Sequence, residues 1–106
     1  MFKTQLLRSH KAMNFKLTHH SRIRAVQRLV LQEKSELFID HEINEILRDL
    51  IPYYVDKKNF AYFEIPKKFL IDRHKRTYAI VDQNNGIITS ITPISPSKFI
   101  KIYSMN

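Results

Sequence analysis

The sequence predicts an α+β protein in which two N-terminal helices pack on a C-terminal antiparallel sheet of about four strands. Apolar residues recur at helical spacing in the first half of the chain, and β-branched and aromatic runs separated by turn residues fill the second half. Helices followed by a run of strands is the order of an α+β fold. The length of 106 residues fits a single domain with one hydrophobic core.

The single domain divides into four parts by composition. Residues 1–17 form a basic N-terminal segment, which is either a short amphipathic helix or a loose arm. Residues 18–51 are the helical part and residues 53–93 the antiparallel sheet. Residues 94–106 form a basic, aromatic tail that we expect to pack on the edge of the sheet.

The first helix is expected to run from about His19 to Gln32. Thr18 is a suitable N-cap, because its hydroxyl can accept hydrogen bonds from amides of the first turn. The apolar residues expected to face the core are Ile23, Val26, Leu29 and Val30.

The second helix is expected to start at Asp40, a favourable N-cap, and to end near Leu50, because Pro52 cannot continue a helix. Its apolar face consists of Ile43, Ile46, Leu47 and Leu50. Its outer face is acidic and is interpreted as a solvated or protein-binding strip, formed by Asp40, Glu42, Glu45 and Asp49.

Strands are expected from Asn59 to Ile65, from Thr77 to Asp82 and from Ile87 to Thr92, with a further short apolar run at Phe69–Ile71. The last two strands flank an Asn-Gly pair at Asn85, which predicts a hairpin turn with positive φ angles. Residues 72–76 form a polar loop, and Pro93 and Pro96 end the last strand.

The formal charge of +8 is unevenly distributed. Residues 1–34 and 57–106 are strongly basic, whereas residues 35–56 are acidic. A fold that brings the basic segments together presents a cationic face, for which nucleic acid is the expected partner. An acidic protein and an anionic membrane surface are the competing partners.

Cysteine is absent, so the chain has no disulfide and no thiolate metal site. No apolar run approaches the ~18 residues that a membrane span requires. We therefore expect a cytoplasmic protein without a membrane partner.

His20, Arg24 and Arg28 are spaced four residues apart, so on a helix they stack along one ridge. Guanidinium groups pair with phosphate oxygens, and an imidazole can move a proton near neutral pH. This spacing indicates phosphodiester cleavage. The ordinary alternative is a solvated basic face.

The order His20-x-x-x-Arg24-x-x-x-Arg28 on an early helix, followed by Gly86-Ile87-Ile88-Thr89 on a late strand, resembles the barnase/EndoU/colicin/RelE (BECR) superfamily of small ribonucleases. It is most similar to RegB-like endoribonucleases. The resemblance implies a RelE-like fold and RNA cleavage without a metal or other cofactor. It implies a catalytic role for His20, a phosphate-stabilising role for Arg24 and a phosphate contact for Thr89. Arg28 is either a phosphate contact or an ion-pair partner of the acidic helix.

Further RNA contacts are expected from basic side chains that can bind phosphates and from tyrosines that can stack on bases. The basic candidates are Arg22, Lys67, Lys68, Arg73, Lys75 and Arg76, and the tyrosines are Tyr62 and Tyr78. DNA is excluded as a substrate of this mechanism, because it lacks the 2′-hydroxyl that attacks the phosphorus.

The function expected from these observations is a metal-independent endoribonuclease that leaves a 2′,3′-cyclic phosphate on mRNA or tRNA. Such a chain would serve as the toxin of a toxin–antitoxin pair or as a phage mRNA-processing factor. A toxin would require an antitoxin with an acidic segment to cover the basic cleft. The alternatives are a non-catalytic module that binds RNA or a host protein, and a regulatory protein that works through its acidic helix.

Overall fold

A computed structural model describes residues 14–105 and confirms the α+β class. In this part of the chain, three α-helices surround a five-stranded mixed sheet, instead of two helices on an all-antiparallel sheet. The prediction for residues 1–13, most of the basic N-terminal segment, lies outside the described residues. No helix of residues 14–105 has the length and apolarity needed to cross a membrane.

The strands are ordered β1-β5-β4-β3-β2 across the sheet. All neighbouring pairs are antiparallel except β1 and β5, which run parallel. The strands are β1 (Lys16–Leu17), β2 (Tyr54–Val55), β3 (Phe60–Glu64), β4 (Thr77–Asp82) and β5 (Ile87–Pro93), and the helices are α2 (His19–Arg28), α3 (Glu36–Arg48), the 3₁₀ turn η1 (Lys67–Phe69) and α4 (Pro96–Ser104).

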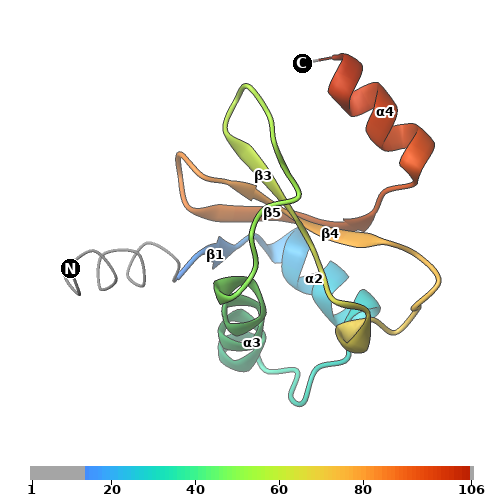
Figure 1. The fold of residues 1–106 in the computed structure, drawn as a ribbon. Helices are drawn as coiled ribbons and strands as arrows, with labels where there is room; N and C mark the ends of the chain where they lie inside the picture. The colour runs from blue at the N-terminus through green and yellow to red at the C-terminus, as the bar shows by residue number, and fades with distance from the viewer. Residues whose placement is uncertain (1–13, 106) are drawn as a thin grey trace, which may run out of the picture.

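Helices cover both faces of the sheet. Figure 1 shows α2 and α3 on one side of the strands and α4 on the other. Ala25 of α2 and Ile43 of α3 pack against Val81 and Ile88 in the main core. Phe99 of α4 packs with Tyr78 on the opposite face. The tail predicted to lie at the sheet edge is therefore a helix lying across a sheet face.

Helix α2 ends at Arg28, four residues earlier than predicted. Leu29 takes an extended conformation and forms an isolated antiparallel bridge with Leu70. The chain thus exchanges helical hydrogen bonds for pairing with the segment after η1, which buries Leu29 at 2% exposure. The expectation that Ile23 and Val30 are buried is wrong, because they are 41% and 56% exposed.

Helix α3 begins at Glu36, with Ser35 as its N-cap residue, so the prediction that Asp40 caps this helix is wrong. Asp40 lies inside the helix, where its carboxylate pairs with Arg22. The predicted core positions Ile43 and Leu47 are buried, and Ile46 and Leu50 are partly buried against the same core.

The predicted hairpin between β4 and β5 is present, but only Gly86 in its turn has a positive φ, of 66°. The Asp82 carboxylate accepts hydrogen bonds from the amides of Asn84 and Asn85 and stabilises the turn. The apolar run Phe69–Ile71 is not a strand of the sheet, because its first residue belongs to the 3₁₀ turn η1. The short strands β1 and β2 were not predicted.

Candidate nucleic-acid interface

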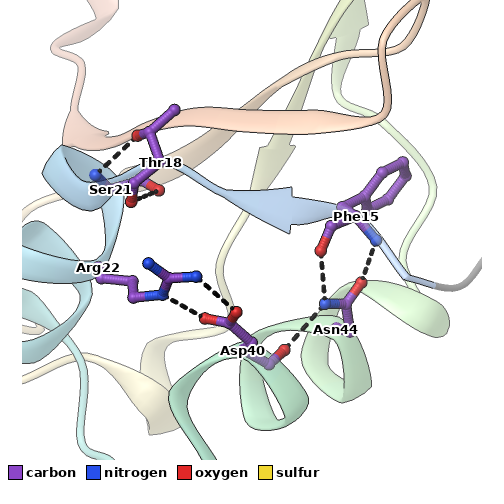
Figure 2. A network of polar contacts seen from close by, with 6 residues as sticks. All are labelled: Phe15, Thr18, Ser21, Arg22, Asp40 and Asn44. Carbon is purple, nitrogen blue, oxygen red and sulfur yellow. Dashed lines mark hydrogen bonds and ion pairs between the residues drawn. The ribbon is translucent and has the colours of Figure 1, made fainter. Parts of the chain in front are cut away.

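Helix α2 starts where β1 ends, and two local hydrogen bonds fix its first turn. The Ser21 amide donates to the Thr18 hydroxyl at 3.0 Å, and the Ser21 hydroxyl donates to the Thr18 carbonyl at 3.0 Å (Figure 2). Thr18 is therefore the N-cap that the sequence predicts. His20 lies in this first turn with an exposed side chain.

A polar network ties the β1–α2 junction to α3. Figure 2 shows the Arg22 guanidinium donating to both carboxylate oxygens of Asp40, at 2.8 and 2.9 Å. In the same view, Asn44 accepts a hydrogen bond from the Phe15 amide at 2.7 Å and donates to the Phe15 carbonyl at 2.9 Å. Helix α3 thereby fixes the positions of both β1 and α2.

Helix α2, which carries the ridge of His20, Arg24 and Arg28, runs along the open side of β5, the edge that β1 leaves unpaired beyond Ile88. Strand β1 pairs only with the start of β5, at Ile87 and Ile88. Beyond that point, an Nη1 hydrogen of Arg28 donates to the carbonyl of Ile91. Since the Thr18 amide donates to the Ile88 carbonyl at the other end of the helix, α2 runs alongside β5 from Ile88 towards Ile91.

The two arginines of the ridge differ in their surroundings. Arg28 is partly buried, and burial, followed by the neighbouring charge of Arg24, lowers the pKa of its guanidinium. Arg24 is half-exposed and donates one hydrogen bond, at 2.8 Å, to the side-chain carbonyl of Gln27. Most of the five N–H donors of Arg24 thus remain available to a ligand.

Thr89 occupies an irregularity in β5. Val81 of β4 pairs with Ile88 and Ile80 pairs with Ser90, so Thr89 is left as the extra residue of a β-bulge. Its side chain is half-buried, and its hydroxyl donates to the Ile80 carbonyl at 3.1 Å. A hydroxyl has one proton, so in this arrangement Thr89 has only acceptor capacity left for a ligand.

The fold brings the chain segments of the three predicted catalytic residues together. His20 and Thr89 lie two residues and one residue, respectively, beyond the 3.4 Å hydrogen bond between Thr18 and Ile88. Arg24 follows His20 by one helical turn. No hydrogen bond within the described residues joins these three side chains directly, and His20 faces solvent instead of an enclosed cavity.

Two of the arginines predicted to bind RNA are held in ion pairs. Hydrogen bonding to Asp40 raises the pKa of Arg22, and hydrogen bonding to Glu64 raises the pKa of Arg76. Arg76 contacts both carboxylate oxygens of Glu64, at 3.1 and 3.0 Å. These charges have structural partners, whereas Arg73 and Lys75 are exposed and form no ion pair with any of residues 14–105.

The expectation that Tyr78 stacks on a base is wrong. Tyr78 is 1% exposed, and its ring lies 4.9 Å from the ring of Phe99 in an edge-to-face arrangement. Tyr62 packs against Phe99 in the same layer, with ring centroids 5.5 Å apart. The alternating pattern of the strand sequences does not reveal that α4 covers the face on which Tyr62 and Tyr78 lie.

His74 and Lys98 were not singled out from the sequence, and the structure places them beside the predicted residue Lys75. They line the same surface depression as Lys75, although they come from the loop before β4 and from the first turn of α4. Basic character was the one available signal, since no periodicity connects residues of separate segments. Among the described residues, no three His, Asp or Glu side chains lie together so that they could hold a metal ion.

The chain matches no protein-family model, no curated protein and no solved structure.

Proposed function

We propose that the protein is a metal-independent endoribonuclease with a BECR-type arrangement of helices and sheet. The observation that supports this proposal most strongly is the course of the ridge along the open side of β5. It presents an exposed imidazole at His20 and, one turn later, the largely unengaged guanidinium of Arg24. This pairing of a proton acceptor with a fixed cation suits an RNA phosphodiester.

The proposed reaction uses the ribose of the substrate as the nucleophile. Neutral His20 takes the proton of the 2′-hydroxyl, and the 2′-oxygen bonds to phosphorus while the bond from phosphorus to the 5′-oxygen breaks. The products are a 2′,3′-cyclic phosphate and a 5′-hydroxyl, whose proton comes from water. Arg24 stabilises the charge on the non-bridging oxygens, a contribution of ~3 kcal/mol for one well-placed donor.

Thr89 enters this proposal as a contact that needs a small rearrangement. Its hydroxyl must leave the Ile80 carbonyl before it can donate to a phosphate oxygen. Rotation about χ1 accomplishes this without moving the backbone. Thr89→Val therefore removes the proposed contact while preserving the shape of the side chain.

Incubation of the purified protein with total RNA in EDTA tests the proposal. We expect discrete fragments with 2′,3′-cyclic phosphate ends. General base catalysis contributes ~10²- to 10⁴-fold, so His20→Ala should lower the cleavage rate by about that factor. His19→Ala is the matched control, because His19 neighbours His20 in the same turn but lines the depression between α2 and α3.

Absence of fragments, or cleavage at the wild-type rate by His20→Ala, would contradict the proposal.

The second candidate is a non-catalytic module that binds RNA through the same ridge. Two observations favour it: the Thr89 hydroxyl donates within the sheet, and the described residues provide no hydrogen-bonding partner that orients His20. This module would bind RNA in EDTA and leave it intact.

The proposed biological role is that of a toxin in a toxin–antitoxin pair or of a phage factor that processes mRNA. In the first case the partner would be an antitoxin with an acidic segment that covers the ridge. Both roles place RNA, rather than DNA, at the interface.

A further inference from the structure

Two depressions lie in continuation of the ridge, at the end where Arg28 is located. Gln27, Arg28, Lys75 and Pro93 line the first, and Lys75 and Pro93 also line the second. The two depressions therefore adjoin at Lys75 and Pro93, and together they are called the groove. The lining of the groove includes Arg28, His74, Lys75, Pro93, Pro96 and Lys98.

The groove is lined by more basic than acidic side chains. Lys75 and Lys98 are exposed and form no ion pair with any of residues 14–105. Asp72 lines the first depression, where its carboxylate accepts a hydrogen bond from the His74 amide at 3.0 Å. Arg76 is neutralised by Glu64. The two lysines are therefore the groove cations most available to an anion.

The second depression also has apolar walls. Pro93, Ile94 and Pro96 line it together with the side chains of His74, Lys75 and Lys98. Its volume of about 580 Å³ exceeds the roughly 150 Å³ of the first and falls within the ~300–1,000 Å³ of typical ligand sites. Apolar walls beside cations suit a chain in which flat bases and ribose rings alternate with phosphates.

We propose that this groove binds the nucleotides on one side of the cleaved bond, with Lys75 and Lys98 contacting successive phosphates of single-stranded RNA. This inference rests on the proposed function, because it extends the same RNA path. From His20 to Arg28 the ridge extends over ~12 Å at 1.5 Å per residue. Arg28 is the last residue of the ridge and also lines the first depression, so it lies where the two meet. The groove thus lengthens the interface by one further cationic site.

Binding of an RNA that cannot be cleaved tests the groove. The probe is a fluorescein-labelled single strand of about ten nucleotides with 2′-O-methyl riboses, long enough for the ~4–16 nucleotides of single-strand sites. We expect the double variant Lys75→Ala, Lys98→Ala to bind about tenfold more weakly. Loss of two phosphate contacts should also reduce the slope of log K against log salt by about 1.4.

Lys58→Ala is the matched control, because Lys58 is an exposed lysine beside the β4–β5 turn, at the other end of the sheet. It should bind the probe as the wild type does. Equal affinities and equal salt slopes for the wild type and the double variant on the long probe would overturn the inference.

The two proposals fail in different ways. If the groove binds the probe as expected and total RNA stays intact, the nuclease proposal fails and the groove remains. If total RNA is cleaved while the double variant binds the long probe normally, the groove inference fails and the nuclease proposal remains.

Discussion

Asn44 has a structural role, because its side chain joins α3 to the residue that precedes β1. Its amide pairs with both backbone groups of Phe15 and also donates to the Asp40 carbonyl at 2.8 Å. We expect Asn44→Ala to lower the free energy of unfolding by about 2 kcal/mol, because partly buried backbone groups lose their partners. Urea unfolding measures this change.

His41→Ala is the control for this substitution, since His41 lies on the same helix with an exposed side chain. It should change stability by less than ~0.5 kcal/mol. Because Asn44 holds the entry to β1, hydrogen exchange at the Lys16 amide, which donates to the Gly86 carbonyl, should also become faster in Asn44→Ala. Equal urea midpoints for the two variants would show that the hydrogen bonds between Asn44 and the Phe15 backbone do not stabilise the protein.

Individual residues were predictable where the information is local. Thr18 caps α2 through a residue three positions away, so the sequence was sufficient to identify it. Arg22 and Asp40 lie 18 positions apart, and charge alone could not show that they pair instead of facing a ligand. The side-chain direction of Thr89 depends on a bulge, which shifts the register and has no signature in the sequence.

Phe99 is the buried side chain of α4 on the second face of the sheet. Phe99 is 3% exposed and lies against the rings of Tyr54, Tyr62 and Tyr78, with centroids 6.1, 5.5 and 4.9 Å away. Removal of a buried phenyl ring typically costs 3–5 kcal/mol. Phe99→Ala should therefore lower the free energy of unfolding by about that amount in a urea titration.

Ile100→Ala serves as the reference, because Ile100 is on the same helix and is 63% exposed. It should be nearly neutral. A near-neutral effect of Phe99→Ala would mean that α4 contributes little to folding, and the groove lined by Lys98 would then lose its structural support.

At the level of elements, the periodicity of apolar residues predicted helices and strands better than did the residues expected to mark their ends. The β4–β5 hairpin and the core face of α3 follow their patterns. Pro96 was interpreted as a stop, whereas it occupies the first turn of α4 after Ser95, whose hydroxyl accepts from the Lys98 amide. Strands β1 and β2 have two residues each, and only pairing with β5 and β3 defines them.

Across the molecule, residues from separate basic segments meet, and several acids of α3 have partners within the chain. Arg28 and Lys75, from separate basic segments, line one depression. On α3, Asp40 pairs with Arg22, Glu42 accepts from the Gln32 amide, and Glu45 pairs with Arg48. Most of the acidic strip thus has intramolecular partners, which weakens the case for a protein-binding surface there.

We expect the aromatic layer between the sheet and α4 to make the stability of the protein sensitive to alkaline pH. Burial raises the pKa of Tyr62 and of Tyr78 above the usual value of 10.0, and a hydrogen bond with Tyr53 raises the pKa of Tyr103 to about 12. In the unfolded chain these phenols ionise near pH 10. Above that pH the unfolded state binds fewer protons than the folded state, so the free energy of unfolding falls as pH rises.

The urea midpoint should therefore be highest at about pH 8 and should decline at about pH 10 and 11. Deprotonation of lysines also acts in this range, so the informative comparison is with Tyr62→Phe, which removes one titrating phenol and keeps the ring. We expect the midpoint of Tyr62→Phe to decline less steeply than that of the wild type, because the variant lacks the phenol whose pKa is raised by burial. If both proteins lose stability at the same rate, the ionisation of Tyr62 does not drive alkaline unfolding.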